Sequence, residues 1–148
     1  MAGYSGRPLA VKLGIADGMV VGVLDAPASF DPHAVDGMPE GATVRTQARG
    51  QLDVIMSFHV RRAQMEARIP VLLRALEVDG GLWFCWPKKA SGVTTDITED
   101  TVREVCLPLG LVDNKVCAVD DIWSALRVVW RRELRAELRR KTGRQPDR

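Results

Sequence analysis

Two short apolar runs with a helical pattern between them constrain the fold of this 148-residue chain more than any other feature. Residues 53–58 and 82–86 are almost continuously apolar, as strands are when helices cover both faces of a parallel sheet. Between them Met65, Ile69 and Leu72 recur at intervals of three and four, which is the spacing of one helix face. The pattern predicts a strand, a helix and a second strand, with the strands parallel and the crossover right-handed.

The flanking segments extend this unit into a larger sheet. Apolar runs at 19–24 and 43–46 predict two strands on the amino-terminal side. Residues 115–119 and 123–130 are rich in strand-forming side chains and too close together for a crossover helix, so they predict an antiparallel hairpin. The fold class is α/β: a compact three-layer domain whose mostly parallel sheet ends in a C-terminal antiparallel hairpin. Helices are expected at 8–13, at 62–78 with a glycine turn at 79–81, and up to about 107 after a cap at Asp96 or Thr98.

Charge is divided unevenly along the chain. Residues 127–148 contain nine Lys or Arg and three Asp or Glu, whereas the remainder contains 12 and 16. We expect one domain over 1–135 and a basic, flexible tail over 136–148. Glu133 and Glu137 favour a solvated helix in this basic segment, and the alternative is a surface that contacts nucleic acid or another acidic partner.

No stretch of the sequence has the properties of a targeting or membrane segment. The first residues lack the apolar core of a signal peptide, and no apolar run approaches the roughly 18 residues that span a bilayer. These features predict a cytoplasmic protein without membrane contact. Cys85, Cys106 and Cys117 lie in apolar surroundings without a Cys-x-x-Cys pair and are predicted to be buried thiols. The two histidines form no cluster with metal-ligand spacing, so no metal site is expected.

The order of the predicted elements resembles the Rossmann-like fold of S-adenosylmethionine-dependent methyltransferases. Residues 13–25 look like the helix, turn and first strand of that superfamily, in which a glycine-rich loop follows and lets the backbone approach the cofactor. Here residues 26–30 contain no glycine, and Pro27 fixes φ and removes an amide donor. The second strand ends at Arg45 and not at an acidic residue for ribose hydroxyls. The sequence therefore predicts a Rossmann-like domain with no cofactor.

A second resemblance rests on four phrases of the sequence, residues 86–92, 102–104, 110–118 and 123–127. In these phrases the chain resembles a family of small bacterial proteins, frequent in actinobacteria, that carries only a domain-of-unknown-function label. The likeness covers nearly the whole chain, up to about Arg135. It implies an actinobacterial, cytoplasmic origin and no particular reaction.

The polar segment after residues 82–86 is the first candidate binding site, because α/β proteins place ligands at the carboxyl ends of parallel strands. Lys88 and Lys89 follow the strand, Ser91 offers a hydroxyl and Gly92 an adaptable backbone. With Trp86 as a wall, these residues predict a cradle for a carboxylate or phosphate. The alternative is a surface turn with two solvated lysines.

Three other strand ends carry candidate residues. Asp25 is expected to bind a ligand hydroxyl or amine, unless it is a turn residue. His59 suits acid–base chemistry near neutral pH, with a structural, hydrogen-bonded histidine as the alternative. Asp120 is a candidate base only if its strand runs parallel to the 82–86 strand, and otherwise it is turn chemistry. The catalytic candidates are thus Lys88, His59 and Asp120.

The leading interpretation is a protein that binds a small anionic metabolite, or regulates in response to it, without a redox cofactor. One alternative is a cofactor-independent acid–base enzyme of the lyase, isomerase or cyclase type. Another is a protein or nucleic-acid interaction module that uses the basic tail, although nucleic acid is not the expected partner. A weak homodimer is expected if residues 128–130 form an edge strand that pairs with a second copy.

Overall fold

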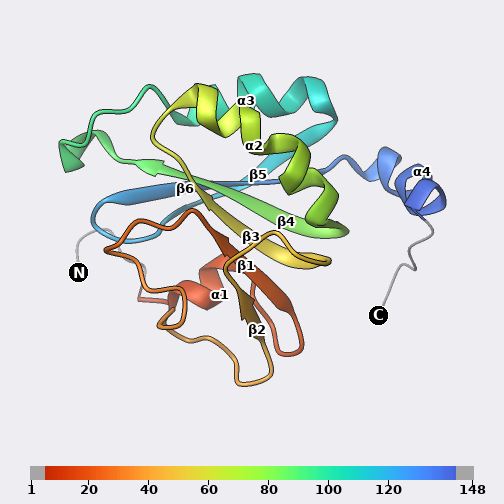
Figure 1. The fold of residues 1–148 in the computed structure, drawn as a ribbon, viewed down its shortest axis with the longest axis horizontal. Helices are drawn as coiled ribbons and strands as arrows, with labels where there is room; N and C mark the ends of the chain where they lie inside the picture. Colours follow the sequence, from red (N-terminus) through yellow and green to blue (C-terminus); the bar gives the residue numbers. More distant parts are fainter. Residues whose placement is uncertain (1–5, 143–148) are drawn as a thin grey trace.

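The computed structural model describes residues 6–142 and has one six-stranded sheet at its centre (Figure 1). The spatial order of the strands is β2-β1-β3-β4-β6-β5. Strands β2, β1, β3 and β4 run parallel to one another, whereas β6 is antiparallel to both β4 and β5. The predicted Rossmann-like α/β fold, mostly parallel with a C-terminal antiparallel hairpin, is confirmed. The strands are β1 (Val20–Leu24), β2 (Thr43–Arg45), β3 (Leu52–Phe58), β4 (Leu76–Pro87), β5 (Leu111–Ala118) and β6 (Trp123–Trp130).

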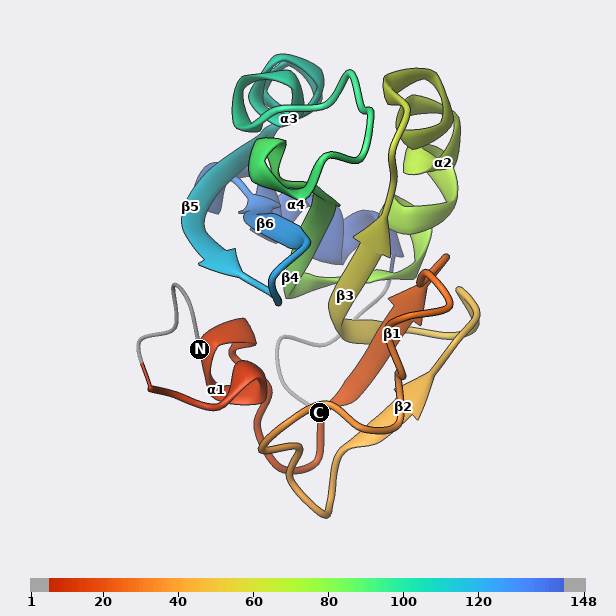
Figure 2. The same cartoon turned by 90° about the vertical axis from the view of Figure 1, so that its left-hand side faces the viewer.

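Helices cover the two faces of the sheet unequally. Figure 2 shows α2 and α3 together on one face, whereas α1 and the long segment 25–42 lie on the other. Each face has its own buried cluster, with Leu72, Phe84 and Val102 under α2 and α3, and Leu13 and Trp83 under α1. The helices are α1 (Leu9–Leu13), α2 (Arg62–Ala75), α3 (Glu99–Cys106) and α4 (Arg132–Thr142), with 3₁₀ turns η1 (Lys89–Ser91) and η2 (Leu107–Leu109).

The start of β4 differs from the sequence prediction. The helix predicted to reach residue 78 ends at Ala75, and Leu76 already has extended dihedrals. Gly80 and Gly81 therefore lie inside β4 and do not form a turn. A Cβ on Gly80 would lie 2.6 Å from the backbone oxygen of Asp53, where the register between β3 and β4 shifts. Glycine is required there by the close approach of two strand backbones.

The carboxyl-terminal hairpin is longer than predicted, and its order differs from the expected one. β5 begins at Leu111 directly after Gly110, whose φ of 95° ends η2. Because β6 pairs with β4 on one side and β5 on the other, Val128 and Val129 are not on an edge. The predicted self-association through an edge strand at residues 128–130 is therefore wrong, because β6 already pairs with a strand on each side.

The direction of β5 decides where Asp120 lies. β5 is antiparallel to β6, and β6 is antiparallel to β4, so β5 runs parallel to β4. The turn after β5 thus reaches the same edge of the sheet as the carboxyl end of β4. This meets the condition on strand direction that the sequence analysis set for Asp120.

Part of the predicted tail is helical. α4 extends through Thr142, and Arg139 forms an ion pair with Asp79 of β4. Arg135 Nε donates to the Trp130 carbonyl oxygen at 3.0 Å, which ties the helix to the end of β6. Residues 143–148 of the predicted tail lie outside the described residues.

Of the two residues predicted to cap α3, Asp96 and Thr98, the structure uses Thr98. Thr98 is the N-cap, its hydroxyl accepting from the Thr101 amide, and the Thr98 amide donates to the Thr101 hydroxyl at 3.0 Å. Asp96 does not cap the helix, because its Oδ1 accepts from the amide of Arg62 at the start of α2. The carboxylate of Asp96 thus links α3 to the β3–α2 turn.

The three thiols are buried as predicted. Burial raises the pKa of Cys106 to about 12 and the pKa of Cys85 well above its ordinary range. Among residues 6–142, no helix combines the length and apolar character that crossing a membrane requires.

Candidate functional site

Four of the predicted site residues lie along one edge of the sheet. Asp25 follows β1, His59 follows β3, Lys88 follows β4, and Asp120 lies in the turn after β5. The parallel direction of these strands brings their carboxyl ends to the same edge. Each side chain nevertheless has its own partners, so the edge holds separate arrangements and not one cluster.

Lys88 and Asp120 form a bracket around the β5–β6 turn. Lys88 Nζ donates to the backbone oxygen of Asp120 at 2.7 Å, and the Lys88 amide donates to the Ile122 carbonyl at 2.7 Å. The carboxylate of Asp120 accepts from the amides of Ile122 and Trp123 at 2.9 and 2.8 Å. The bracket fixes the turn, and the catalytic roles expected of these two residues remain predictions.

The segment predicted as an anion cradle is a compact turn. The Ser91 hydroxyl donates to the Lys88 carbonyl at 2.6 Å and accepts from the Val93 amide at 3.1 Å. Gly92 has a φ of 78° and ends η1. Lys89 is exposed, whereas Trp86 is buried in the cluster under α2 and α3. The Ser91 hydroxyl is engaged with backbone, and Trp86 packs on the helical side of the sheet.

Asp25 and His59 lie beside each other at the next strand ends. Asp25 is the one described non-glycine residue with a positive φ, 57°, and its carboxylate pairs with Arg68 Nε of α2 at 3.1 Å. His59 is buried, with Nε2 at 2.6 Å from the Ser57 hydroxyl and Nδ1 at 2.6 Å from Gln64 Oε1. An amide oxygen only accepts, so Nδ1 carries the proton and Nε2 accepts from Ser57.

The environment of His59 keeps its ring neutral. Burial lowers the pKa of His59, and the hydrogen bond to Gln64 and the charge of Asp25 offset this only in part. An imidazole with two short hydrogen bonds inside the protein matches the structural alternative given above. Its acid–base role stays a prediction.

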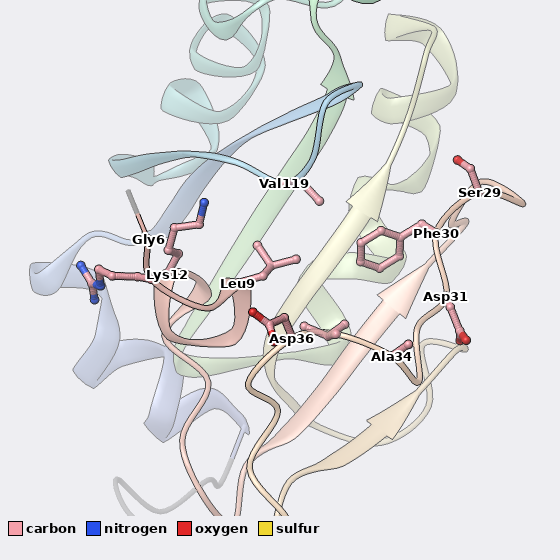
Figure 3. A pocket seen from close by; sticks show the side chains of 11 residues that line it. Gly6, Leu9, Lys12, Ser29, Phe30, Asp31, Ala34, Asp36 and Val119 are labelled. Carbon is pink, nitrogen blue, oxygen red and sulfur yellow. The ribbon is translucent and has the colours of Figure 1, made fainter. Parts of the chain in front are cut away.

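A cavity of about 400 Å³ lies on the face of the sheet that α1 covers, next to the edge where the parallel strands end. It opens between α1, segment 25–42 and the β5–β6 turn, and Figure 3 shows the Phe30 ring and the side chains of Leu9 and Val119 around it. Its volume falls within the roughly 300–1,000 Å³ usual for small-molecule sites. Its lining residues are Gly6, Arg7, Leu9, Lys12, Ser29, Phe30, Asp31, Ala34, Val35, Asp36 and Val119.

Hydrogen bonds join the walls of this cavity. Lys12 Nζ of α1 donates to the Ala118 carbonyl at 3.0 Å, linking α1 to the end of β5. The Ala10 amide donates to the Asp36 carbonyl at 3.0 Å, linking α1 to segment 25–42. The Val119 amide donates to the Trp123 carbonyl at 2.9 Å, which fixes the third wall to β6. Three segments distant in sequence are thus held around one space.

Sequence reasoning missed the cavity because no single stretch contains it. Leu9, Phe30 with Asp36, and Val119 come from three segments whose proximity depends on the tertiary fold. One signal was available in the sequence. Phe30 is a large aromatic residue in a loop rich in Pro, Asp and Gly, and an apolar ring in such a loop can mark a binding surface.

The strand ends that the methyltransferase resemblance singles out do not fit its cofactor loop. Residues 25–30, which follow β1, contain Asp25 and Pro27 and no glycine. Beyond β2 lies an open hollow that contains Arg45 and Arg49, with Arg45 Nη1 donating to the Arg49 carbonyl at 2.6 Å. Cationic side chains there replace the carboxylate that would accept from ribose hydroxyls.

Comparisons with known proteins identify a fold and no sequence family. No model of a known family matches the chain, and no curated protein matches it in sequence. Magnesium protoporphyrin IX methyltransferase from Synechocystis, solved with bound S-adenosylmethionine, has a TM-score of 0.53 and 13% identity over 82% of this chain and 74% of that chain. A TehB-like S-adenosylmethionine-dependent methyltransferase from Corynebacterium glutamicum gives 0.53 and 11% over 88% and 91%. One from Aquifex aeolicus gives 0.54 and 12% over 82% and 93%.

These matches place the chain in the Rossmann-like fold class of the S-adenosylmethionine-dependent methyltransferases. They contradict the prediction of a protein that binds, or responds to, a small anionic metabolite, because a solved protein of this fold holds S-adenosylmethionine instead. The same finding overturns the first alternative, the cofactor-independent acid–base enzyme, whereas the interaction module of the basic tail stays an untested prediction. The prediction gave the missing glycine loop after β1 more weight than the strand order, which the chain shares with these proteins.

Proposed function

We propose that this chain binds S-adenosylmethionine in the cavity between α1 and segment 25–42 and that it belongs functionally with the methyltransferases. One observation carries the proposal: the cavity adjoins the carboxyl edge of the parallel strands and is walled by the segment that follows β1. In open α/β sheets this edge is where ligands bind. The solved methyltransferases of the same fold supply the ligand class.

The chemistry of the lining supports a ligand that is aromatic at one end and charged at the other. Leu9, Phe30 and Val119 provide apolar surface. Asp31 and Asp36 provide carboxylates, which attract a sulfonium or ammonium group and accept hydrogen bonds from ribose hydroxyls. Both carboxylates are on exposed residues, so their contribution to affinity is screened by water.

S-adenosylmethionine, when bound, supplies a methyl group on a positively charged sulfur that a nucleophile of the acceptor can take. In this chain the ligand is held by side chains of α1 and segment 25–42, because the loop after β1 lacks the glycines that bring backbone amides to a cofactor. The cavity walls restrict its orientation through the hydrogen bonds between α1, β5 and segment 25–42.

Calorimetric titration tests this proposal. The chain is expected to bind S-adenosylmethionine and S-adenosylhomocysteine, and Asp36→Asn should raise the Kd for the cationic S-adenosylmethionine by roughly fivefold, the effect of removing one partly exposed charge. The Kd for uncharged-sulfur S-adenosylhomocysteine should change less. Glu40→Gln removes an equally exposed charge from the same segment outside the cavity and should leave both values as they are.

The methyltransferase part of the proposal is tested with a labelled methyl group. Incubation of the chain and labelled S-adenosylmethionine with a cell extract should transfer label to an acceptor, and Asp36→Asn should reduce the transfer at limiting cofactor. If the parent chain gives no heat of binding with either S-adenosylmethionine or S-adenosylhomocysteine, cofactor binding is refuted. Binding without transfer to any acceptor fraction would refute the enzymatic part alone.

A further inference from the structure

Phe30 has an environment that its position in a loop does not explain. It lies half-buried on segment 25–42, and its ring borders the cavity opposite Leu9 (Figure 3). A ring placed to fill the core would be covered on both faces. Here one side is packed against protein and the other is turned to a space large enough for a small molecule.

The packed side of Phe30 is built from two further rings. Its centroid is 5.0 Å from that of Phe58 at an interplanar angle of 46°, and Phe58 meets Trp123 edge-on at 5.1 Å. Phe58 and Trp123 are both buried, at 3% and 6% exposed. Aromatic pairs at these separations attract each other and restrict ring motion. Phe30 is therefore held in one orientation from behind.

The bracket of Lys88 and Asp120 extends this support. Asp120 accepts from the Trp123 amide at 2.8 Å, and the Trp123 carbonyl accepts from the Val119 amide at 2.9 Å. Trp123 thus packs against the Phe58 ring and also holds Val119 in the wall of the cavity. Lys88 and Asp120 therefore fix the turn that holds Trp123 and the Val119 wall.

We infer that Phe30 is the platform on which the aromatic base of the ligand stacks, so that this cavity selects a nucleoside. The inference rests on the proposed function for the identity of the nucleoside, an adenosine joined to a charged amino-acid end. A rigid ring with one open side suits a flat base, because stacking uses the face of the base and needs no hydrogen-bond partner. The charged end then lies toward the carboxylates of Asp31 and Asp36.

The Phe30 ring could instead contact the sulfonium group, and this would change the affinities of the two ligands differently. A ring can also attract the sulfonium cation directly. Stacking with adenine acts equally on S-adenosylmethionine and S-adenosylhomocysteine, whereas attraction to the cation acts on S-adenosylmethionine alone. The two ligands therefore separate the two geometries.

The test compares ring removal on the two faces of the sheet. Phe30→Leu keeps an apolar side chain and removes the platform, and it should raise the Kd for S-adenosylmethionine, S-adenosylhomocysteine and adenosine alike, by about fivefold or more. Phe30→Trp should retain binding within about threefold of the parent because it restores a π-face. Phe84→Leu is the matched control: Phe84 is buried among the residues under α2 and α3, so the same change there should lower stability and leave each Kd unchanged.

A spectroscopic signature distinguishes stacking from a structural role. The adenine H2 and H8 proton resonances should shift upfield on binding to the parent and to Phe30→Trp, and much less on binding to Phe30→Leu. Equal Kd values for the parent and Phe30→Leu, or a loss confined to S-adenosylmethionine, would overturn the inference.

Failure of the proposed function gives a separate result. A parent chain that binds adenosine through Phe30 but not S-adenosylmethionine would contradict the proposed function and keep the platform. A parent chain that binds adenosine in neither calorimetry nor proton spectra would contradict the platform itself.

Discussion

At the scale of single residues, the edge of the sheet shows how polar side chains can satisfy one another without forming a shared site. The Ser57 hydroxyl, the His59 ring and the Gln64 amide make a short chain of hydrogen bonds inside the protein. The carboxylate of Asp25 pairs with Arg68, and that of Asp120 accepts from the amides of Ile122 and Trp123. The residues with the most recognisable chemistry are thus used for structure, while the cavity is lined by less conspicuous ones.

The buried ring of His59 predicts a pH-dependent stability. An unfolded histidine takes up its proton near pH 6.5, whereas burial lowers the pKa of His59 in the folded chain. Between these two values the unfolded state binds more protons, so the free energy of unfolding should fall as the pH is lowered through 6.5. Urea unfolding followed by circular dichroism at pH 5.5 and 7.5 measures the slope.

The variant His59→Gln should flatten that slope, because the residue no longer titrates, even though its hydrogen bonds are altered at both pH values. His33→Gln removes the other histidine, which is exposed on segment 25–42, and serves as the control. A slope in His59→Gln equal to that of the parent would contradict the account of this ring.

The candidate site could be predicted from the sequence only in part, and the reason lies at this scale. Strand ends were predictable, so Asp25, His59 and Lys88 were correctly placed at one edge, whereas the place of Asp120 depended on a strand direction that the sequence left open. Whether a side chain points to a ligand or to a neighbouring amide depends on turn geometry that local sequence patterns do not specify.

At the scale of secondary-structure elements, strands and helices were predictable where periodicity was strong, and their boundaries were not. The β3–α2–β4 unit follows from its apolar spacing, as does the pairing of β5 with β6. The start of β4 was missed because glycines are read as turn formers, although here they allow two backbones to approach. The start of β5 was missed because its exposed edge residues lack strand-like alternation.

The glycines of β4 give a test of this interpretation. Gly80→Ala should lower the free energy of unfolding by about 2 kcal/mol, because the new Cβ would lie 2.6 Å from the Asp53 backbone oxygen and the strands would have to move apart. Gly81→Ala meets only the guanidinium of Arg127, which can move, and should cost less. Urea unfolding of both variants measures the difference. A larger loss for Gly81→Ala would contradict the explanation.

At the scale of the whole molecule, the sheet separates a well-covered face from a sparsely covered one. α2 and α3 cover the first, whereas a five-residue helix and an irregular segment cover the second (Figure 2). A segment without a long helix leaves space between itself and α1, and the cavity occupies that space. In the sequence the missing glycine loop after β1 counted against a cofactor, whereas the lack of a long helix in the same segment leaves room for the ligand that we propose.

The burial of all three cysteines predicts that thiol chemistry reports on global unfolding. Cys85 and Cys106 are 1% exposed and Cys117 is 8% exposed, and burial raises the pKa of each thiol, which leaves little reactive thiolate. In the native chain a disulfide reagent at pH 7.5 should therefore react only as fast as the protein unfolds. Rapid reaction of any one thiol, with the others unreactive, would show local opening and contradict this prediction.

The location of ligand binding is the central claim, and one measurement tests it directly. Titration of the isotope-labelled chain with S-adenosylmethionine, followed by amide proton–nitrogen spectra, should shift the resonances of Leu9, Phe30, Asp36 and Val119 around the cavity. The resonances of Arg45 and Arg49 beyond β2 should stay in place. Shifts confined to the β2 hollow, or no shifts at ligand concentrations in the millimolar range, would contradict the account.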